Sequence, residues 1–247
     1  MAVAQAEESP LVQFEIHRLV EIEVGGVDVS FTNSSLWMVI GVAVATLLLT
    51  FAMRKRAMVP GRGQSIAELS YEFVASMVRD NVGSGGRRYF PFIFTLFMFI
   101  LFSNVLGLVP FSFTPTSHII VTFAMAIVVF TGVTVIALVK HKHRFFTLFL
   151  PQGIPIALAP MLIVIELISY LARPITLSLR LFANMMAGHT LLEVFGGFVV
   201  ALGIFGFAPL AVTVALFGLE IIVAFLQAYV FAVLSALYLN DALHLHH

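Results

Sequence analysis

A single permanent charge interrupts the apolar stretch Leu177-Ser178-Leu179-Arg180-Leu181-Phe182-Ala183-Asn184-Met185-Met186-Ala187-Gly188-His189. The guanidinium of Arg180 cannot lose its proton in a protein. Held at the centre of a membrane helix, such a charge costs about 3 kcal/mol on translocon-insertion scales. We therefore expect this arginine to be retained for function.

The 247-residue chain has the composition of an integral membrane protein. Hydrophobic residues make up 60% of it and charged residues 11%, and its mean hydropathy is +1.05; soluble domains are about 25% charged. The absence of cysteine from the sequence excludes a disulfide framework and thiolate metal sites. The 13 basic and 13 acidic residues balance, so no nucleic-acid partner is indicated. We expect neither a metal nor a cofactor.

Charge is distributed unevenly along the chain. Residues 1–35 are mostly polar, with six acidic residues and one basic residue, whereas basic clusters lie at 54–56 and 140–144. Basic clusters beside membrane helices mark the cytoplasmic side. The acidic segment is therefore predicted to lie outside, and we expect no cleavable signal peptide in it.

Apolar runs predict a single membrane domain over residues 36–247. Residues 36–53 nearly reach the roughly 20 needed for a crossing. Residues 63–82 mix apolar and charged side chains, which is typical of an amphipathic helix on the cytoplasmic surface. Residues 90–139 hold two apolar runs around a proline-containing break, and they predict a transmembrane hairpin.

Two longer apolar elements follow at 154–192 and 211–239, with a glycine-rich turn predicted between them around Gly196, Gly197 and 203–209. As a helix the first would be about 58 Å long, whereas the hydrocarbon core is about 30 Å thick. It must tilt steeply, bend or break. The predicted fold class is therefore an all-α, polytopic membrane protein.

Polar residues recur at seven-residue spacing in the first long element, at Glu166, Arg173 and Arg180. Two turns of an α-helix advance 7.2 positions, so these side chains share nearly one face, which Asn184 continues. His189 lies nine residues after the last arginine and faces elsewhere.

The second long element repeats the spacing at Glu220 and Gln227, and Asp241 lies three heptads after the glutamate. In an antiparallel hairpin of the two elements, Arg180 would meet Gln227. His189 would approach Glu220 nearer the turn. An imidazole changes charge near neutral pH, so such a pair can pass a proton.

Structural roles are open for several of these residues. Asn184 and Gln227 can hydrogen-bond neighbouring helices together. Glu193, near the turn, can lie at the membrane interface with its carboxylate in water. The histidines that end the chain, which include His246 and His247, can form a solvated or headgroup-level tail.

The run from Glu166 to His189, which ends RPITLSLRLFANMMAGH, is followed by Glu220 and Gln227 in a second apolar element. This pattern resembles the subunit a family of F-type ATP synthases, the stator half of a proton channel. The resemblance extends from about residue 36 onward and is most specific in SLRLFANMMAGH. Many bacterial members have glutamate at the position of His189 and histidine at that of Glu220, so this chain resembles the mitochondrial arrangement.

The resemblance implies a non-catalytic subunit whose two long, steeply inclined C-terminal helices face a rotating c-ring, alongside the subunit b peripheral stalk and membrane lipid. Protons would be its only small substrate. Arg180 would be the stator arginine that faces the ring carboxylate. The half-channel from the outer side would be lined by Asn184, His189, Glu220 and Gln227. The inner half-channel would be lined by Glu166, Arg173 and Asp241.

The expected location is a bacterial inner membrane, with a periplasmic N-terminus and a cytoplasmic C-terminus. An alternative function is a secondary transporter that couples solute movement to protons, but the sequence lacks the internal symmetry typical of that class. An intramembrane hydrolase is disfavoured because the sequence has no HExxH or GxSxG motif. The cost of the buried arginine argues against a purely structural scaffold.

Overall fold

The structure is a computed structural model that describes residues 12–24, 27–28, 30–54, 57–109, 112–142, 145 and 159–244. Three sequence predictions concern residues outside these ranges: the first eleven residues of the acidic segment, positions 154–158 of the first long element, and His246 and His247 of the terminal tail.

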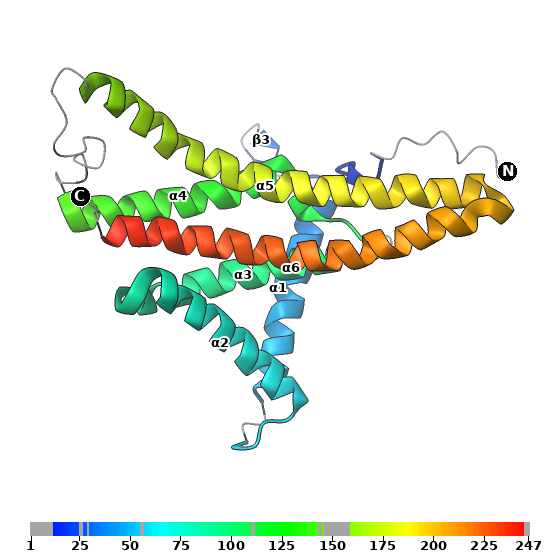
Figure 1. The fold of residues 1–247 in the computed structure, drawn as a ribbon, viewed down its shortest axis with the longest axis horizontal. Coiled ribbons are helices and arrows are strands. Elements are labelled where there is room, and N and C mark those ends of the chain that lie inside the picture. The colour runs from blue at the N-terminus through cyan, green and yellow to red at the C-terminus, as the bar shows by residue number, and fades with distance from the viewer. Residues whose placement is uncertain are drawn as a thin grey trace. The chain divides into compact units, whose positions relative to one another are not determined.

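The described part of the chain is mostly helical (Figure 1). Its α-helices are α1 (Asn33–Ala52), α2 (Arg62–Val82), α3 (Phe90–Gly107), α4 (Ile119–His141), α5 (Ala159–Ala201) and α6 (Phe207–Leu243). All except α2 are long and apolar enough to cross a membrane. The predicted all-α, polytopic class is therefore confirmed.

The N-terminal segment contains short strands that the sequence analysis did not predict. After the 3-10 turn η1 (Val12–Phe14), β1 (Arg18–Val20) pairs antiparallel with β4 (Phe31–Thr32), and β2 (Glu23–Val24) pairs with β3 (Val27–Asp28). Hydrogen bonds from Ser30 to the carboxylate of Asp28 are the main reason that the pKa of this aspartate lies below its ordinary value.

The turn between the two long helices lies within the predicted range 203–209, but Gly196 and Gly197, which the prediction also assigns to it, do not belong to it. Gly196 and Gly197 are inside α5, which continues to Ala201; glycine is frequent in membrane helices. The chain turns at η6 (Gly203–Gly206), where Gly203 has φ of 53°, a left-handed conformation that glycine adopts without a Cβ clash. The prediction is wrong only for Gly196 and Gly197, because glycine content alone does not distinguish a helical position from a turn.

The chain forms two compact units. Unit 1 consists of Met1–Arg54, Met98–His118 and Leu181–Ala228, and unit 2 consists of Lys55–Phe97, Ile119–Arg180 and Tyr229–His247. Helices α3, α5 and α6 each contribute residues to both.

A fully buried asparagine holds three elements of unit 1 together. Asn104 of α3 donates a hydrogen bond from Nδ2 to the carbonyl of Ala224 in α6, at 3.1 Å. Its Oδ1 accepts one from the hydroxyl of Thr116, in η3 (Pro115–Ser117), at 2.7 Å. Ala224 and Ala228 are also fully buried, and such small residues let membrane helices approach closely.

In unit 2, the residues 63–82 for which a surface helix is predicted lie in the helix α2, which has apolar side chains on both its buried and its exposed positions; its location at the cytoplasmic surface stays a prediction. Val74, Met77 and Val78 are buried, whereas Ile66 and Leu69 are both 68% exposed. The helix is interrupted at its end by Gly83, with φ of 74°, where η2 (Gly83–Arg88) begins.

The ends of α4 and α6 are joined by two polar contacts in unit 2. Lys140 Nζ donates to the carbonyl of Leu243 at 2.7 Å, and His141 Nε2 lies 3.0 Å from the carbonyl of Ala242. The last carbonyls of a helix lack partners within the helix, and a cation there also interacts favourably with the helix dipole. The basic cluster therefore caps α6 as well as ending α4.

We predict that Asn104→Ala lowers the stability of the subunit by about 2 kcal/mol, because it removes two hydrogen bonds and leaves the buried Thr116 hydroxyl without its acceptor. A lower thermal unfolding midpoint of the purified complex would report this loss. The adjacent Ser103 is the matched control, because its buried hydroxyl has no hydrogen-bond partner among the described residues. If Ser103→Ala destabilised the complex as much as Asn104→Ala, the role given to the asparagine would be wrong.

Candidate functional site

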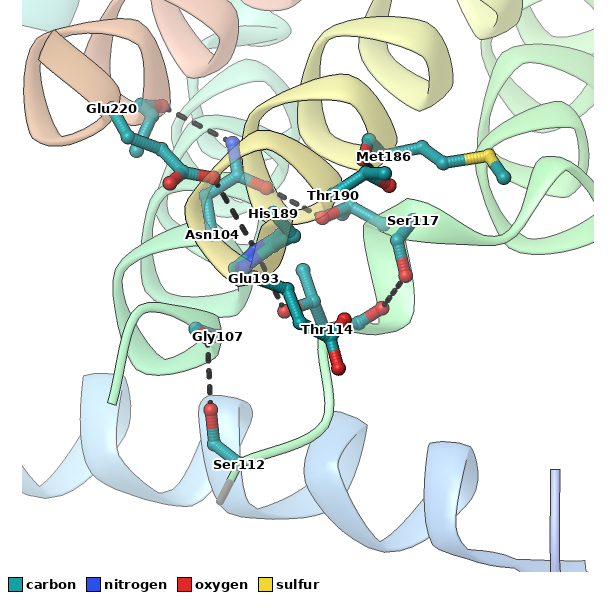
Figure 2. A network of polar contacts seen from close by, with 12 residues as sticks. Asn104, Gly107, Ser112, Thr114, Ser117, Met186, His189, Thr190, Glu193 and Glu220 are labelled. Carbon is teal, nitrogen blue, oxygen red and sulfur yellow. Dashed lines mark hydrogen bonds and ion pairs between the residues drawn. The ribbon is translucent and has the colours of Figure 1, made fainter. Parts of the chain in front are cut away.

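The site in unit 1 centres on a buried imidazole and a buried carboxylate that face each other (Figure 2). His189 of α5 and Glu220 of α6 have side chains that are only 9% and 5% exposed. Nε2 of the histidine lies 3.6 Å from Oε1 of the glutamate. This is the approach that the antiparallel hairpin predicted from the sequence.

A hydroxyl group holds the imidazole from a third element. Thr114, which precedes η3, lies with Oγ1 at 3.0 Å from Nε2 of His189. The carbonyl of Thr114 accepts a hydrogen bond from the Ser117 hydroxyl at 2.6 Å, which fixes the backbone of the threonine. The same ring nitrogen therefore faces a hydroxyl at bonding distance and a carboxylate slightly beyond it.

The carboxylate of Glu220 is buried without a conventional hydrogen bond. Neither Oε1 nor Oε2 has a hydrogen-bond partner among the described residues. An isolated buried carboxylate is expensive when ionised, whereas its protonated form is far less so. The site therefore favours a group that exchanges a proton over one that keeps a fixed charge.

Two glycines leave room for the side chains that flank the imidazole. A Cβ atom at Gly188 would lie 2.6 Å from Oε1 of Glu220. A Cβ atom at Gly107, the last residue of α3, would overlap the side chain of Thr114. A Cβ at Gly107 would overlap a short side chain, whereas a Cβ at Gly188 would displace the carboxylate of Glu220 from its present position.

The imidazole–carboxylate pair lies between two pockets of unit 1. The first, here called the large pocket, has a volume of about 1230 Å³ and is lined in part by Gln13, Phe14, Thr114, His189 and Glu193. The second, here called the small pocket, has a volume of about 280 Å³ and is lined in part by Asn184, Gly188, Glu220 and Gln227. The imidazole borders the large pocket and the carboxylate borders the small one.

Three of the sequence-predicted residues therefore share the small pocket. Asn184 is exposed in the isolated chain, whereas Gln227 and Glu220 are each 5% exposed. With His189, they are the four residues for which the family resemblance implied one common half-channel, which stays a prediction; His189 lines the large pocket and contacts Glu220 of the small one.

A second candidate cluster lies in unit 2. Arg173 of α5 donates from Nη1 to Oδ2 of Asp241 in α6, at 3.1 Å. Its guanidinium carbon lies 5.4 Å from the ring centre of Tyr170 and 5.1 Å from that of Tyr238. Cations are attracted to aromatic faces at such distances, so the guanidinium is held by one carboxylate and two rings.

Two other predicted site residues, Glu166 and Arg180, lie outside both clusters. Glu166 is partly exposed and makes no hydrogen bond or ion pair with a residue in the described part of α5 or its neighbours. Arg180 is exposed and likewise has no ion pair with a described residue. It belongs to unit 2 and Gln227 to unit 1, so their meeting stays a prediction.

The sequence analysis missed Thr114 and Gln13 as contributors to the site. The threonine lies in the break between two predicted crossings, where the proline-rich composition indicated only a turn. Gln13 lies in the polar N-terminal segment, 180 positions before Glu193, whose carboxylate accepts a hydrogen bond from it. No local pattern reveals a contact at that separation.

Within the described ranges, no group of three or more His, Cys, Asp or Glu side chains could hold a metal ion. The titratable groups of the site in unit 1 are the side chains of His189 and Glu220. An imidazole and a carboxylate in buried contact, each open to a different pocket, can accept a proton on one side and deliver it on the other.

Comparison with known proteins identifies the family. The ATP synthase A chain family matches residues 35–240. The chain is 54% identical to ATP synthase subunit a of Pelagibacter ubique over 97% of this chain and 99% of that protein. It is 58% identical to the subunit of the same name from Chelativorans sp., over 95% and 97% of the two chains. For Paramagnetospirillum magneticum the identity is 57%, over 96% and 99%. The resemblance inferred from SLRLFANMMAGH is thus confirmed, and the chain belongs to the ATP synthase A chain family.

Proposed function

We propose that this chain is the proton-translocating stator subunit of an F-type ATP synthase in a bacterial inner membrane. It offers two offset half-channels to a rotating c-ring and does not itself catalyse ATP formation. The observation that carries the proposal is the contact between His189 and Glu220, which border different pockets of unit 1.

The large pocket is the part of the outer half-channel that is open to water. A proton that enters it reaches the imidazole of His189, whose Nε2 lies 3.6 Å from the carboxylate of Glu220. A small displacement of either side chain brings these atoms to hydrogen-bonding distance. Transfer then moves the proton from the large pocket to the small one.

The small pocket delivers the proton to the ring. Glu220 borders it together with the amides of Asn184 and Gln227, which can donate and accept hydrogen bonds. Once a ring carboxylate accepts the proton it is neutral, and it can then face lipid without the cost of a membrane-buried charge. The amides keep that route polar without adding a charge of their own.

Arg180 separates the two half-channels. Its exposure in the isolated chain supports a counter-charge supplied by another subunit, since no described residue pairs with it. A ring carboxylate that has lost its proton is attracted to the guanidinium, which favours the ionised form. The arginine therefore blocks direct proton transfer between the half-channels and promotes proton release.

The cluster around Arg173 belongs to the inner half-channel. Arg173 and Asp241 form an ion pair beside Tyr170 and Tyr238. The pair provides a polar surface near the C-terminal end of α6, where a released proton leaves toward the cytoplasm. Glu166, one heptad before Arg173 on α5, extends this surface.

The membrane potential and the proton gradient would drive protons through the subunit. Each elementary charge moved across the membrane gains about 2.3 kcal/mol per 100 mV. Several protons are therefore needed for each ATP, which makes a ring with many carboxylates a suitable partner. The c-ring and the subunit b peripheral stalk are the partners proposed for this chain.

Replacing Arg180 tests the proposed function directly. We expect Arg180→Ala to abolish ATP-driven proton pumping in membrane vesicles while the complex remains assembled. Arg180→Lys should also fail, because an ammonium is compact and can lose its proton when desolvated. Normal pumping by the assembled alanine variant would contradict the proposal.

Thr114 provides a test of the relay. Thr114→Val keeps the volume of the side chain but removes the hydroxyl that faces His189, and we expect pumping to slow about fivefold for a hydrogen bond worth about 1 kcal/mol. Thr114→Ser retains a hydroxyl and should restore most of the rate. The initial rate of vesicle acidification is the measurement. Equal rates for the valine and serine variants would show that the hydroxyl has no part in transfer.

Gly188 tests the position of the carboxylate. Gly188→Ala should strongly reduce proton transport, because the new methyl group would lie 2.6 Å from Oε1 of Glu220 and must displace it. Alanine is favoured over glycine in helices, so α5 should form normally. Gly132→Ala in α4 is the matched control, since its Cβ meets no atom of the described residues within 4 Å. Undiminished transport by Gly188→Ala would show that this carboxylate position is not needed.

A further inference from the structure

The N-terminal segment reaches the mouth of the large pocket through two contacts. Nε2 of Gln13 donates a hydrogen bond to Oε2 of Glu193 on α5, at 2.6 Å. The ring of Phe14 lies edge-on to His189, with ring centres 6.4 Å apart and planes at 74°. Gln13 and Phe14 also line the large pocket together with His189 and Glu193.

This segment is fixed by the start of α1. Three hydrogen bonds connect Asn33, the first residue of α1, to residues 15 and 17: its backbone N–H donates to the carbonyl of His17 at 3.1 Å, its Nδ2 donates to that of Glu15 at 3.0 Å, and its Oδ1 accepts from the N–H of His17 at 3.2 Å. The pairing of β1 with β4 adds a second attachment. Gln13 and Phe14 thus precede a segment that is held at two places.

Glu193 lies one helical turn after His189 on the same face of α5. It is exposed, and among the described residues that line the large pocket these two are the titratable ones. Glu220 faces the histidine at 3.6 Å, but it lines the small pocket and not the large one. A proton that reaches the imidazole through this pocket therefore moves through a space that the carboxylate of Glu193 also lines.

We propose that Glu193 is the outermost proton-exchanging carboxylate of the half-channel that leads to His189, and that Gln13 and Phe14 position it at the mouth. The inference rests on the proposed function and extends it to a residue and a segment outside the two long polar stripes. The contact partners are 180 positions apart in sequence, and both belong to unit 1.

The physical argument is electrostatic. A carboxylate at the mouth of a low-dielectric pocket concentrates cations there and can raise their arrival rate by about 10-fold to 1,000-fold, an effect that salt screens. The amide of Gln13 binds the carboxylate through a charge-assisted hydrogen bond, which limits its orientations. Gln13 donates without adding a competing charge, so the negative charge stays available to arriving protons.

A cross-linking experiment tests the geometry independently of proton transport. The natural chain has no cysteine, so Gln13→Cys combined with Glu193→Cys creates a unique pair within it. The natural side chains meet at their tips and are each longer than cysteine, whereas a disulfide needs Cβ atoms about 4 Å apart. In the complete complex, a short bifunctional thiol reagent should therefore join the two sulfurs within one chain. Failure to cross-link in the assembled complex would overturn the proposed positioning of Glu193 by this segment.

A second experiment tests the role in proton supply. In proteoliposomes that contain the complete ATP synthase, the rate of ATP synthesis is measured at a fixed driving force while the pH on the proton-supplying side is varied. At about pH 8 and low salt, Glu193→Gln should be about tenfold slower than the natural protein, and the deficit should shrink at about pH 6 and in high salt. Gln13→Ala should show a smaller deficit with the same dependence.

The matched control is Glu23→Gln, which removes the same charge from the exposed strand β2 but lies outside the lining of the large pocket. We expect it to follow the natural protein at every pH. A Glu193→Gln deficit that was equal at both pH values and both salt concentrations, or no deficit at all, would overturn the proposal. If Arg180→Ala stopped pumping but Glu193→Gln synthesised ATP at the natural rate, only this inference would be refuted. If Arg180→Ala still pumped protons, the proposed function itself would be refuted.

Discussion

The cost of ionising a carboxylate among apolar helices governs the architecture of unit 1. Glu220 is 5% exposed, and neither of its oxygens has a hydrogen-bond partner in the described part of the chain. A fixed charge in such a place would destabilise the fold by several kcal/mol. Glutamate is tolerated because it can bind a proton, and a neighbouring imidazole at 3.6 Å can exchange one with it. The expense of the charged state is thus what makes the position suitable for carrying a proton.

Several features of the fold serve this one pair. The absence of a Cβ at Gly188 admits the carboxylate, and the absence of one at Gly107 admits Thr114, which holds the imidazole. Asn104 joins α3 to α6 one turn beyond Glu220, at the carbonyl of Ala224. Each contact restricts motion while leaving the two titratable groups without a permanent ionic partner. A full ion pair on either group would hold one charge state and oppose transfer.

The parts of this arrangement that repeat along a helix could be predicted from the sequence. The seven-residue spacing placed Glu166, Arg173 and Arg180 on nearly one helix face. The antiparallel hairpin placed His189 near Glu220, because chain reversal fixes which positions of the two elements meet. Glycine content located the turn at 203–209 but also assigned Gly196 and Gly197 to it, where the chain is still helical, since glycine is compatible with both states. Thr114 and Gln13 could not be found in this way. They reach the site from irregular segments, whose paths depend on tertiary hydrogen bonds such as those of Asn33, and no periodic signal encodes such contacts.

The permanently charged residues and the titratable residues of the two long helices lie in different surroundings. Arg173 keeps its charge and is matched by Asp241 and two aromatic rings within unit 2. Arg180 also keeps its charge, yet it is exposed and has no ion-pair partner among the described residues. His189 and Glu220, whose charges can be removed, are the buried ones. A permanent cation is costly on a membrane helix, whereas a titratable group can be buried in its neutral form. Under the proposed function, a ring carboxylate would neutralise the exposed Arg180, while the two groups that exchange the proton are buried within this chain.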